Sequence, residues 1–205
     1  MTTYVPALTL PDRLFASPAA SILTPIVLGS AVGIGISSKS TVAGILRHAL
    51  TDHQDKETKT TYMRLRQPPL SPPTWAFGPV WTVLYGVMGY ASYRAYTNGT
   101  SPFSTPEVIA TTRHAATVYS VQLALNLIWT PLFFGVKKKP VAATVDIVAL
   151  LGTNVYLTYL WSTVDQVSAY CQLPYLGWLS FATYLCAGIG YVNNWDLNAT
   201  EPKSE

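Results

Sequence analysis

Charged side chains are scarce in this sequence, and their scarcity is uneven. Only 11% of the 205 residues are Asp, Glu, Lys or Arg, against about 25% in a typical soluble domain. Charge is absent from five long blocks, which are residues 14–38, 67–93, 115–136, 147–164 and 166–195. A helix needs about 20 mostly apolar residues to cross a bilayer, whereas a soluble helix needs a polar face. The blocks exclude an ordinary soluble fold and predict an all-α integral membrane protein, a bundle of five transmembrane helices.

Residues that build disulfide frameworks, metal sites and hydrolytic centres are also few. The two cysteines, Cys171 and Cys186, indicate neither a disulfide framework nor a zinc site. His48, His53 and His114 have no second ligand-type residue at a useful helical spacing, and there is no phosphate-binding glycine loop. The net charge of +3 is too small to indicate nucleic-acid binding. We therefore predict no catalytic residue, no metal ligand and no required cofactor.

The hydrophobic blocks divide the chain into one membrane domain with two tails. We expect an N-terminal tail over 1–17, a first transmembrane helix over 18–38, a long loop over 39–73, four further transmembrane helices within 74–195 and a C-terminal tail over 196–205. The tail before the first helix lacks the features of a signal or matrix-targeting peptide, so the first block is expected to stay as an anchor. The four later helices are placed at 74–97, 108–135, 140–162 and 173–195, with Pro174 in a first turn.

The basic residues predict how the helices are oriented. Ten of the thirteen Lys and Arg residues fall in the first loop, the third loop and the C-terminal tail, which share one side of a five-helix bundle. Basic loops stay on the cytosolic side. We therefore expect these loops and the C-terminus in the cytosol and the N-terminus opposite.

The end of the long loop differs from its middle. Residues 51–61 are polar and mixed in charge, and we expect them to be mobile, whereas Pro68-Pro69 and Pro72-Pro73 predict a stiff, extended segment that leads into the second helix. Long loops are often disordered or functional. The segment beside the second helix is the part for which we expect a function.

Small and aromatic residues recur at helical spacing in the first two helices. Gly29 and Gly33 form a small-xxx-small pair, which allows another helix to approach closely. In the second helix, small residues repeat every four positions and aromatic or sulfur-containing residues follow a neighbouring face. The small stripe is Gly78, Thr82 and Gly86, and the neighbouring face carries Trp81, Tyr85 and Met88. Packing and ligand contact both explain such an aromatic stripe.

Polar residues inside the third and fourth helices need partners. Gln122, Asn126, Trp129 and Phe133 share one face, and amides within hydrocarbon either hydrogen-bond to other helices or serve as handles in a cavity. Asp146, in the fourth helix, is expected to face the bundle or reach the interface, in a structural role rather than in proton transfer.

The six tryptophans fall into two groups. One group lies near predicted helix ends, where indoles suit the membrane interface, and consists of Trp75, Trp161 and Trp195. The other lies further inside and consists of Trp81, Trp129 and Trp178. Three inward indoles with one Gln and one Asn would form an aromatic pocket with few polar groups, which suits a flat hydrophobic ligand.

Several of these segments together resemble the TspO/MBR family of translocator proteins, also called tryptophan-rich sensory proteins or peripheral benzodiazepine receptors. The segment from Pro72 to Tyr90, PPTWAFGPVWTVLYGVMGY, is similar to the family's second-helix signature. Gln122 to Asn126, QLALN, and the following Trp129 are similar to its third helix, Val145-Asp146 to its fourth, and PYLGWLSFAT from Pro174 to its fifth. The similar region runs from about residue 62 to 183.

The resemblance implies a function for the inward residues. Family members are five-helix membrane proteins that bind tetrapyrroles such as protoporphyrin IX and haem, and animal members bind cholesterol and drugs in the same cavity. Carried over by position, the implied ligand-binding residues are Tyr62, Pro68, Pro69, Trp81, Asn126, Trp129 and Trp178. The sterol motif of animal members is broken here, since Ala187 and Tyr191 stand at its Tyr and Arg positions.

Three functional hypotheses follow. The first is a membrane receptor or transport protein for porphyrin, haem or a related hydrophobic ligand. The second is an enzyme that degrades porphyrin with pocket tryptophans. The third is a sterol- or lipid-binding scaffold that forms a homodimer through its small-residue faces. The resemblance implies the outer mitochondrial membrane as the location, with the endoplasmic reticulum or another internal membrane as the alternative, and a lipid bilayer with no nucleic acid as partner.

Overall fold

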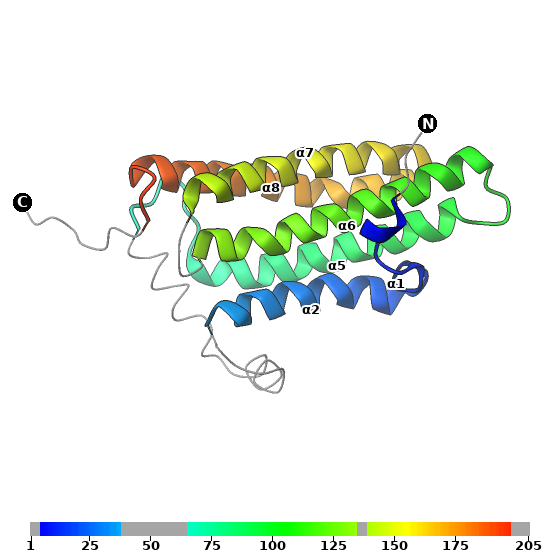
Figure 1. The fold of residues 1–205 in the computed structure, drawn as a ribbon, viewed down its shortest axis with the longest axis horizontal. Coiled ribbons are helices and arrows are strands. Elements are labelled where there is room, and N and C mark those ends of the chain that lie inside the picture. Colours follow the sequence, from blue (N-terminus) through cyan, green and yellow to red (C-terminus); the bar gives the residue numbers. More distant parts are fainter. Residues whose placement is uncertain (1–4, 38–64, 135–138, 198–205) are drawn as a thin grey trace, which may run out of the picture.

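The computed structural model describes residues 5–37, 65–134 and 139–197, and the regular secondary structure in this part of the chain is entirely helical. It consists of η1 (Pro6–Leu8), α1 (Asp12–Ala16), α2 (Pro18–Ser37), α5 (Thr74–Gly99), α6 (Pro106–Phe134), α7 (Pro140–Val164) and α8 (Gln166–Val192). The described residues contain no strand, which confirms the all-α prediction for them. Figure 1 shows the long helices lying side by side along one axis.

The long helices pack as antiparallel neighbours. The principal pairs in contact are α6 with α7, α7 with α8, α2 with α5 and α5 with α8. One apolar core lies among α5, α6, α7 and α8 and includes Met88, Leu123, Leu157 and Leu179. A second, smaller core around Phe133, Ile147 and Ile189 lies near the end of the bundle to which the long loop returns.

The outward faces of the bundle are apolar. On α7, for example, Val141, Val145, Val148 and Val155 are all more than half exposed. By length and composition, α6 and α7 are the two described helices apolar enough to cross a membrane, and Pro18–Val32 is a shorter apolar stretch.

The last helix begins earlier than its sequence suggests. The prediction of a start at residue 173 was wrong, because α8 begins at Gln166 and Pro174 lies inside it. The reason is the cap. The side chain of Asp165 accepts a hydrogen bond from the backbone N–H of Ser168 at 2.9 Å, which satisfies a free donor of the first turn. Pro174 is exposed, so its ring lies on the outer face of the bundle.

Residues before the first long helix form a docked segment instead of a free tail. Thr9 Oγ1 lies 2.7 Å from Thr117 Oγ1, and the Leu10 N–H donates to Ser120 Oγ at 2.8 Å. Phe15 is buried, stacked on Tyr96 with a centroid separation of 5.3 Å. These contacts hold η1 and α1 against α5 and α6.

Close helix approach occurs at one of the expected glycines, Gly29, and at Gly89, but not at Gly78 or Gly86. A Cβ added at Gly78 or Gly86 would meet nothing within 4 Å, so the predicted small stripe of α5 does not pack against another described part of this chain. Gly89 does, because a Cβ there would lie 2.7 Å from Ile22 Cα on α2. Gly29 faces the ring of Tyr85 on α5. The surroundings of Gly33 lie outside what the structure describes.

The tryptophans predicted near helix ends differ in exposure in the structure. Trp75 is 70% exposed at the start of α5, as an interfacial indole would be. Trp161, three residues before the end of α7, is 2% exposed, so its indole packs inside the bundle and not on its surface. The reason is that it belongs to the main apolar core and lies 6.0 Å from the Tyr119 ring.

Candidate functional site

Asn126 lies at the centre of a hydrogen-bonded group that joins three helices. Tyr85 on α5 donates its hydroxyl proton to Asn126 Oδ1 at 2.6 Å. Asn126 Nδ2 on α6 donates to the hydroxyl of Tyr175 on α8 at 2.8 Å. Asn126 and Tyr175 are 4% and 1% exposed, so little water competes for these bonds. We call Tyr85, Asn126 and Tyr175 the clamp, because it holds the three helices at one relative height.

A second polar layer lies one helical turn from the clamp. Asn154 on α7 donates to Gln122 Oε1 at 3.3 Å, and Gln172 on α8 donates to Asn154 Oδ1 at 2.7 Å. All three side chains are 0% exposed. Of the two explanations for Gln122 and Asn126, hydrogen bonding between helices is therefore the one observed. Asn126 keeps a lone pair or an N–H that these bonds do not use, so it can also contact a ligand.

The clamp places three indoles at one level of the bundle. Trp81 precedes Tyr85 by four residues, while Trp129 follows Asn126 by three and Trp178 follows Tyr175 by three. Because α5 runs opposite to α6 and α8, all three steps lead toward the end of the bundle that receives the long loop. At 1.5 Å of rise per residue, the indoles lie about 4.5–6 Å beyond the clamp.

The indoles make close aromatic contacts. Trp81 and Trp178 meet edge to face with ring centroids 6.3 Å apart, and Phe77 packs edge-on against Trp178 at 5.9 Å. Trp129 stacks instead on Phe133 at 5.2 Å, within the smaller core. The structure thus brings Trp81 and Trp178 into direct contact and places Trp129, on α6, at the same level of the bundle.

One of these indoles has unused hydrogen-bonding capacity. The N–H of Trp178 is buried and has no hydrogen-bond partner among the described residues, whereas the Trp129 side chain hydrogen-bonds to the thiol of Cys186. A buried donor without a partner costs roughly 1–3 kcal/mol. Such groups mark places where a further molecule has something to bind.

The end of the long loop closes over α8 near these rings. Pro68 is buried against Gly188, where an added Cβ would lie 2.9 Å from Pro68 Cβ. The hydroxyl of Tyr184 donates to the carbonyl of Pro69 at 2.9 Å. Residues 65–70, which we call the strap, therefore lie along the last turns of α8. Pro69 itself is exposed, and Tyr62, the remaining predicted ligand residue, lies outside the described residues.

Asn193 fastens the strap to the end of α8. Its Nδ2 donates to the Arg66 carbonyl at 2.9 Å, and its Oδ1 accepts from the Arg66 N–H at 3.2 Å. The chain then turns back, with positive φ at Asn194 and Trp195. This turn buries Leu197 in the smaller core.

Sequence reasoning included Tyr85 in the aromatic stripe but overlooked Tyr175, Phe77 and Asn193 as parts of this site. One signal was present, because the spacing from Tyr175 to Trp178 repeats the spacing from Asn126 to Trp129. No comparable pattern marks Asn193, whose partner Arg66 is far away in the sequence.

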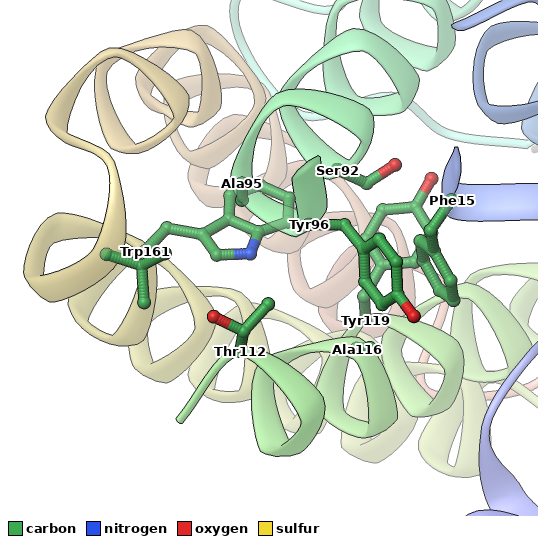
Figure 2. A pocket seen from close by; sticks show the side chains of 9 residues that line it. Phe15, Ser92, Ala95, Tyr96, Thr112, Ala116, Tyr119 and Trp161 are labelled. Carbon is green, nitrogen blue, oxygen red and sulfur yellow. The ribbon is translucent and has the colours of Figure 1, made fainter. Parts of the chain in front are cut away.

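A small cavity lies elsewhere, toward the docked N-terminal segment. Figure 2 shows it among side chains that include Phe15, Tyr96, Tyr119 and Trp161. Its volume is about 10 Å³, roughly enough for a single water. None of the predicted ligand residues lines it.

The described residues contain no group of three or more His, Cys, Asp or Glu able to hold an ion. Asp146 is 9% exposed and faces the bundle, with Oδ2 lacking a hydrogen-bond partner. In the part of the chain that the structure describes, no basic side chain pairs with this oxygen.

Comparison with known proteins gives one consistent result. Residues 39–192 match the model of the TspO/MBR family. A translocator protein homolog of Schizosaccharomyces pombe is 38% identical over 133 residues, covering 64% of this chain and 77% of the relative. A tryptophan-rich protein TspO of Archaeoglobus fulgidus is 37% identical over 67% of this chain and 83% of its own length. The human translocator protein is 37% identical over 60% and 69%.

Proposed function

This chain belongs to the TspO/MBR family of membrane proteins, and on that premise we propose that it binds a tetrapyrrole, porphyrin or haem, or a similarly flat hydrophobic ligand, among Trp81, Trp129 and Trp178. The observation that carries the proposal is the common level of the three indoles, fixed by the clamp on α5, α6 and α8. Large flat aromatic faces with few polar groups are the surroundings that a flat hydrophobic ligand requires.

The ligand would enter once the rings that now touch have parted. Trp81 and Trp178 are both half-buried, so their rings are less confined than the side chains of the buried core. The clamp beneath them is rigid because all its members are hydrogen-bonded. Binding therefore moves the rings and leaves the helix register unchanged.

The strap would cover the bound ligand. Its anchors at Pro68, Pro69 and Arg66 all attach to α8, the helix that carries Trp178. Pro68 and Pro69, carried over from the family resemblance, accordingly act as part of the cover, and Asn126 acts through the clamp.

Titration of the purified protein in detergent with protoporphyrin IX tests the proposal, with tryptophan fluorescence as the signal. We expect saturable one-site quenching, and a Kd at least about tenfold weaker in a Trp81→Phe/Trp178→Phe double variant, or about 1.4 kcal/mol. Linear quenching, equal in both proteins, would mean partition into detergent and would end the proposal. A new porphyrin product on prolonged incubation would instead favour the degrading enzyme.

We further propose that α2, α5, α6, α7 and α8 each cross the membrane. The outward apolar faces support it, together with the excess of Lys and Arg in the first and third loops. Single cysteines at Phe103 and Lys139, in a Cys171→Ser/Cys186→Ser background, should react with an impermeant maleimide from opposite sides. Labelling of both from the same side would refute the five-span topology.

For location we propose the outer mitochondrial membrane, with the endoplasmic reticulum as the alternative. The resemblance to translocator proteins supports this choice, and relatives occur in fission yeast and human. An archaeal relative also exists, so family membership alone gives only a membrane. Imaging of a C-terminal fluorescent fusion against markers of both organelles tests the choice, and a signal on neither would reject it.

A further inference from the structure

We propose that residues 66–72, RQPPLSP, bind a partner protein that recognises proline-rich segments with an aromatic-lined groove, as SH3 domains do. We call these residues the proline motif. The inference goes beyond the proposed ligand site, because it assigns a protein partner to the strap and to the residues that lead from it into α5.

The first step of the argument is the spacing within the proline motif. Arg66, Pro69 and Pro72 stand at every third position. A polyproline II helix has three residues per turn, so in that conformation the three side chains lie along one edge. Segments of the form P-x-x-P dock in the aromatic-lined grooves of SH3 domains. An arginine at one end pairs with carboxylates beside such a groove, which sets the direction of binding.

The second step is exposure. Arg66 and Pro69 are exposed, and Leu70 is 83% exposed. The bonds between Arg66 and Asn193 use the arginine backbone and not its guanidinium. The chain after the motif is already extended, since Pro73 has φ −64° and ψ 146°, close to polyproline II values. Much of the motif is therefore presented on the outside of the bundle.

The third step is the conformation of the motif in the structure. Residues 68–71 form a turn in which Leu70 has φ 67°, and Ser71 Oγ donates to the Pro68 carbonyl at 2.8 Å. A positive φ at the third position of a turn suits glycine and strains a leucine. Proline favours the polyproline II conformation. Straightening the turn thus relieves Leu70 and leaves the motif in the form that a groove binds.

The fourth step concerns the contacts that now hold the strap to α8. Pro68 is buried against Gly188, and Asn193 binds the backbone of Arg66. A groove that takes the proline motif needs the Pro68 ring, so the strap has to leave α8 when the partner binds. Loosening the anchor at Asn193 should therefore strengthen partner binding, whereas loss of a motif residue should weaken it.

The test uses the full-length protein in lipid nanodiscs and a purified SH3 domain that prefers the pattern R-x-x-P-x-x-P. Binding is measured by biolayer interferometry. The same SH3 domain with its groove tryptophan changed to alanine is the control for adhesion to the nanodisc. No porphyrin is present, so the result does not depend on the proposed ligand site.

We expect saturable binding to the wild type. A Pro69→Ala/Pro72→Ala double variant and Arg66→Glu should each weaken it at least about tenfold, and Pro73→Ala, the matched control outside the motif, by less than about twofold. Asn193→Ala should tighten binding severalfold, because it releases the strap without changing the motif. Thermal midpoints of all variants, measured in the same nanodiscs, show whether each one is folded.

Three results would each overturn the inference. One is equal binding of the wild type and a folded double variant. Another is equal binding by the SH3 domain and its groove variant. The third is no saturable binding to either the wild type or Asn193→Ala at SH3 concentrations up to about 1 mM. All three leave the porphyrin titration, and with it the proposed function, to be decided separately.

Discussion

At the scale of single residues, Asp165 joins three parts of the bundle. Its carboxylate accepts from Ser168 Oγ at 2.7 Å, from Arg94 Nε at 2.8 Å and from Asn98 Nδ2 at 3.0 Å. Arg94 and Asn98 lie near the end of α5, while Asp165 caps α8. One side chain thus fixes the height of α5 against the turn between α7 and α8.

The same carboxylate predicts a pH dependence of stability. Burial raises the pKa of Asp165, but the hydrogen bonds from Ser168, Arg94 and Asn98 outweigh burial and lower it below the ordinary value. A lowered folded pKa gives stability that is present above the unfolded pKa, about 3.9, and that is lost as pH falls through the folded pKa. We expect the thermal midpoint in detergent to fall between about pH 5 and 3, and to fall less in Asp165→Asn. Parallel slopes in the two proteins would contradict this assignment.

The clamp gives a second prediction at this scale. Tyr175→Phe removes the acceptor of the Asn126 amide and leaves a buried donor unpaired. Hydrogen bonds between membrane helices average about 0.6 kcal/mol, with a maximum of about 1.7, so we expect a loss within that range in a reversible unfolding assay. Tyr170→Phe is the control because Tyr170 is 62% exposed. Equal stability of the two variants would show that the clamp does not hold the helices.

At the scale of helices, the contact between α2 and α5 depends on Gly89. A Cβ at this position would lie 2.7 Å from Ile22 Cα and 2.9 Å from the carbonyl carbon of Ser21, so the α2 backbone itself would have to move. Overpacking of this kind costs roughly 1–3 kcal/mol.

We therefore expect Gly89→Ala to destabilise the bundle by about that amount. Gly86→Ala is the matched control on the same helix, because a Cβ there meets nothing within 4 Å. Alanine also favours a helix over glycine by about 0.5–1 kcal/mol, so Gly86→Ala should be neutral or stabilising. Thermal unfolding of both variants measures the difference, and equal effects would mean that α2 and α5 do not pack as described.

Sequence patterns sufficed for features that depend on local chemistry. The lack of charge marked the long helices, and the Asn126 and Trp129 face followed from helical spacing alone. Sequence patterns failed where a residue far away in the sequence determines the local structure. Pro174 indicated a helix start, but Asp165 supplied a cap earlier in the chain. Nor does any local pattern tell that Gly89 meets α2 while Gly86 meets nothing, since both are small residues on one helix.

At the scale of the whole molecule, the two ends of the described chain help to hold the bundle together. The segment at Phe15 fills the space between α5 and α6. At the other end, Trp195 packs its ring on Gly190, and Leu197 is 1% exposed in the smaller core beside Phe133. The segments that flank the helices thus contribute side chains to the packing of the bundle.

Leu197→Ala tests this use of the C-terminal turn. Truncating a buried leucine to alanine costs roughly 2–5 kcal/mol, and we expect a loss at the lower end of that range because the smaller core lies near the end of the bundle. Leu70→Ala is the control, since Leu70 is 83% exposed. A thermal midpoint unchanged in both variants would mean that the turn is not docked.

The contact between Trp81 and Trp178 has a consequence for the speed of binding. Rings 6.3 Å apart leave no slot for a macrocycle, so under the proposed function a porphyrin would associate only with molecules in which the rings have already parted. The observed rate in a stopped-flow experiment should therefore level off at high ligand concentration, at a ceiling set by the protein's own opening. Since that ceiling belongs to the protein, chemically different porphyrins should share it even where their affinities differ.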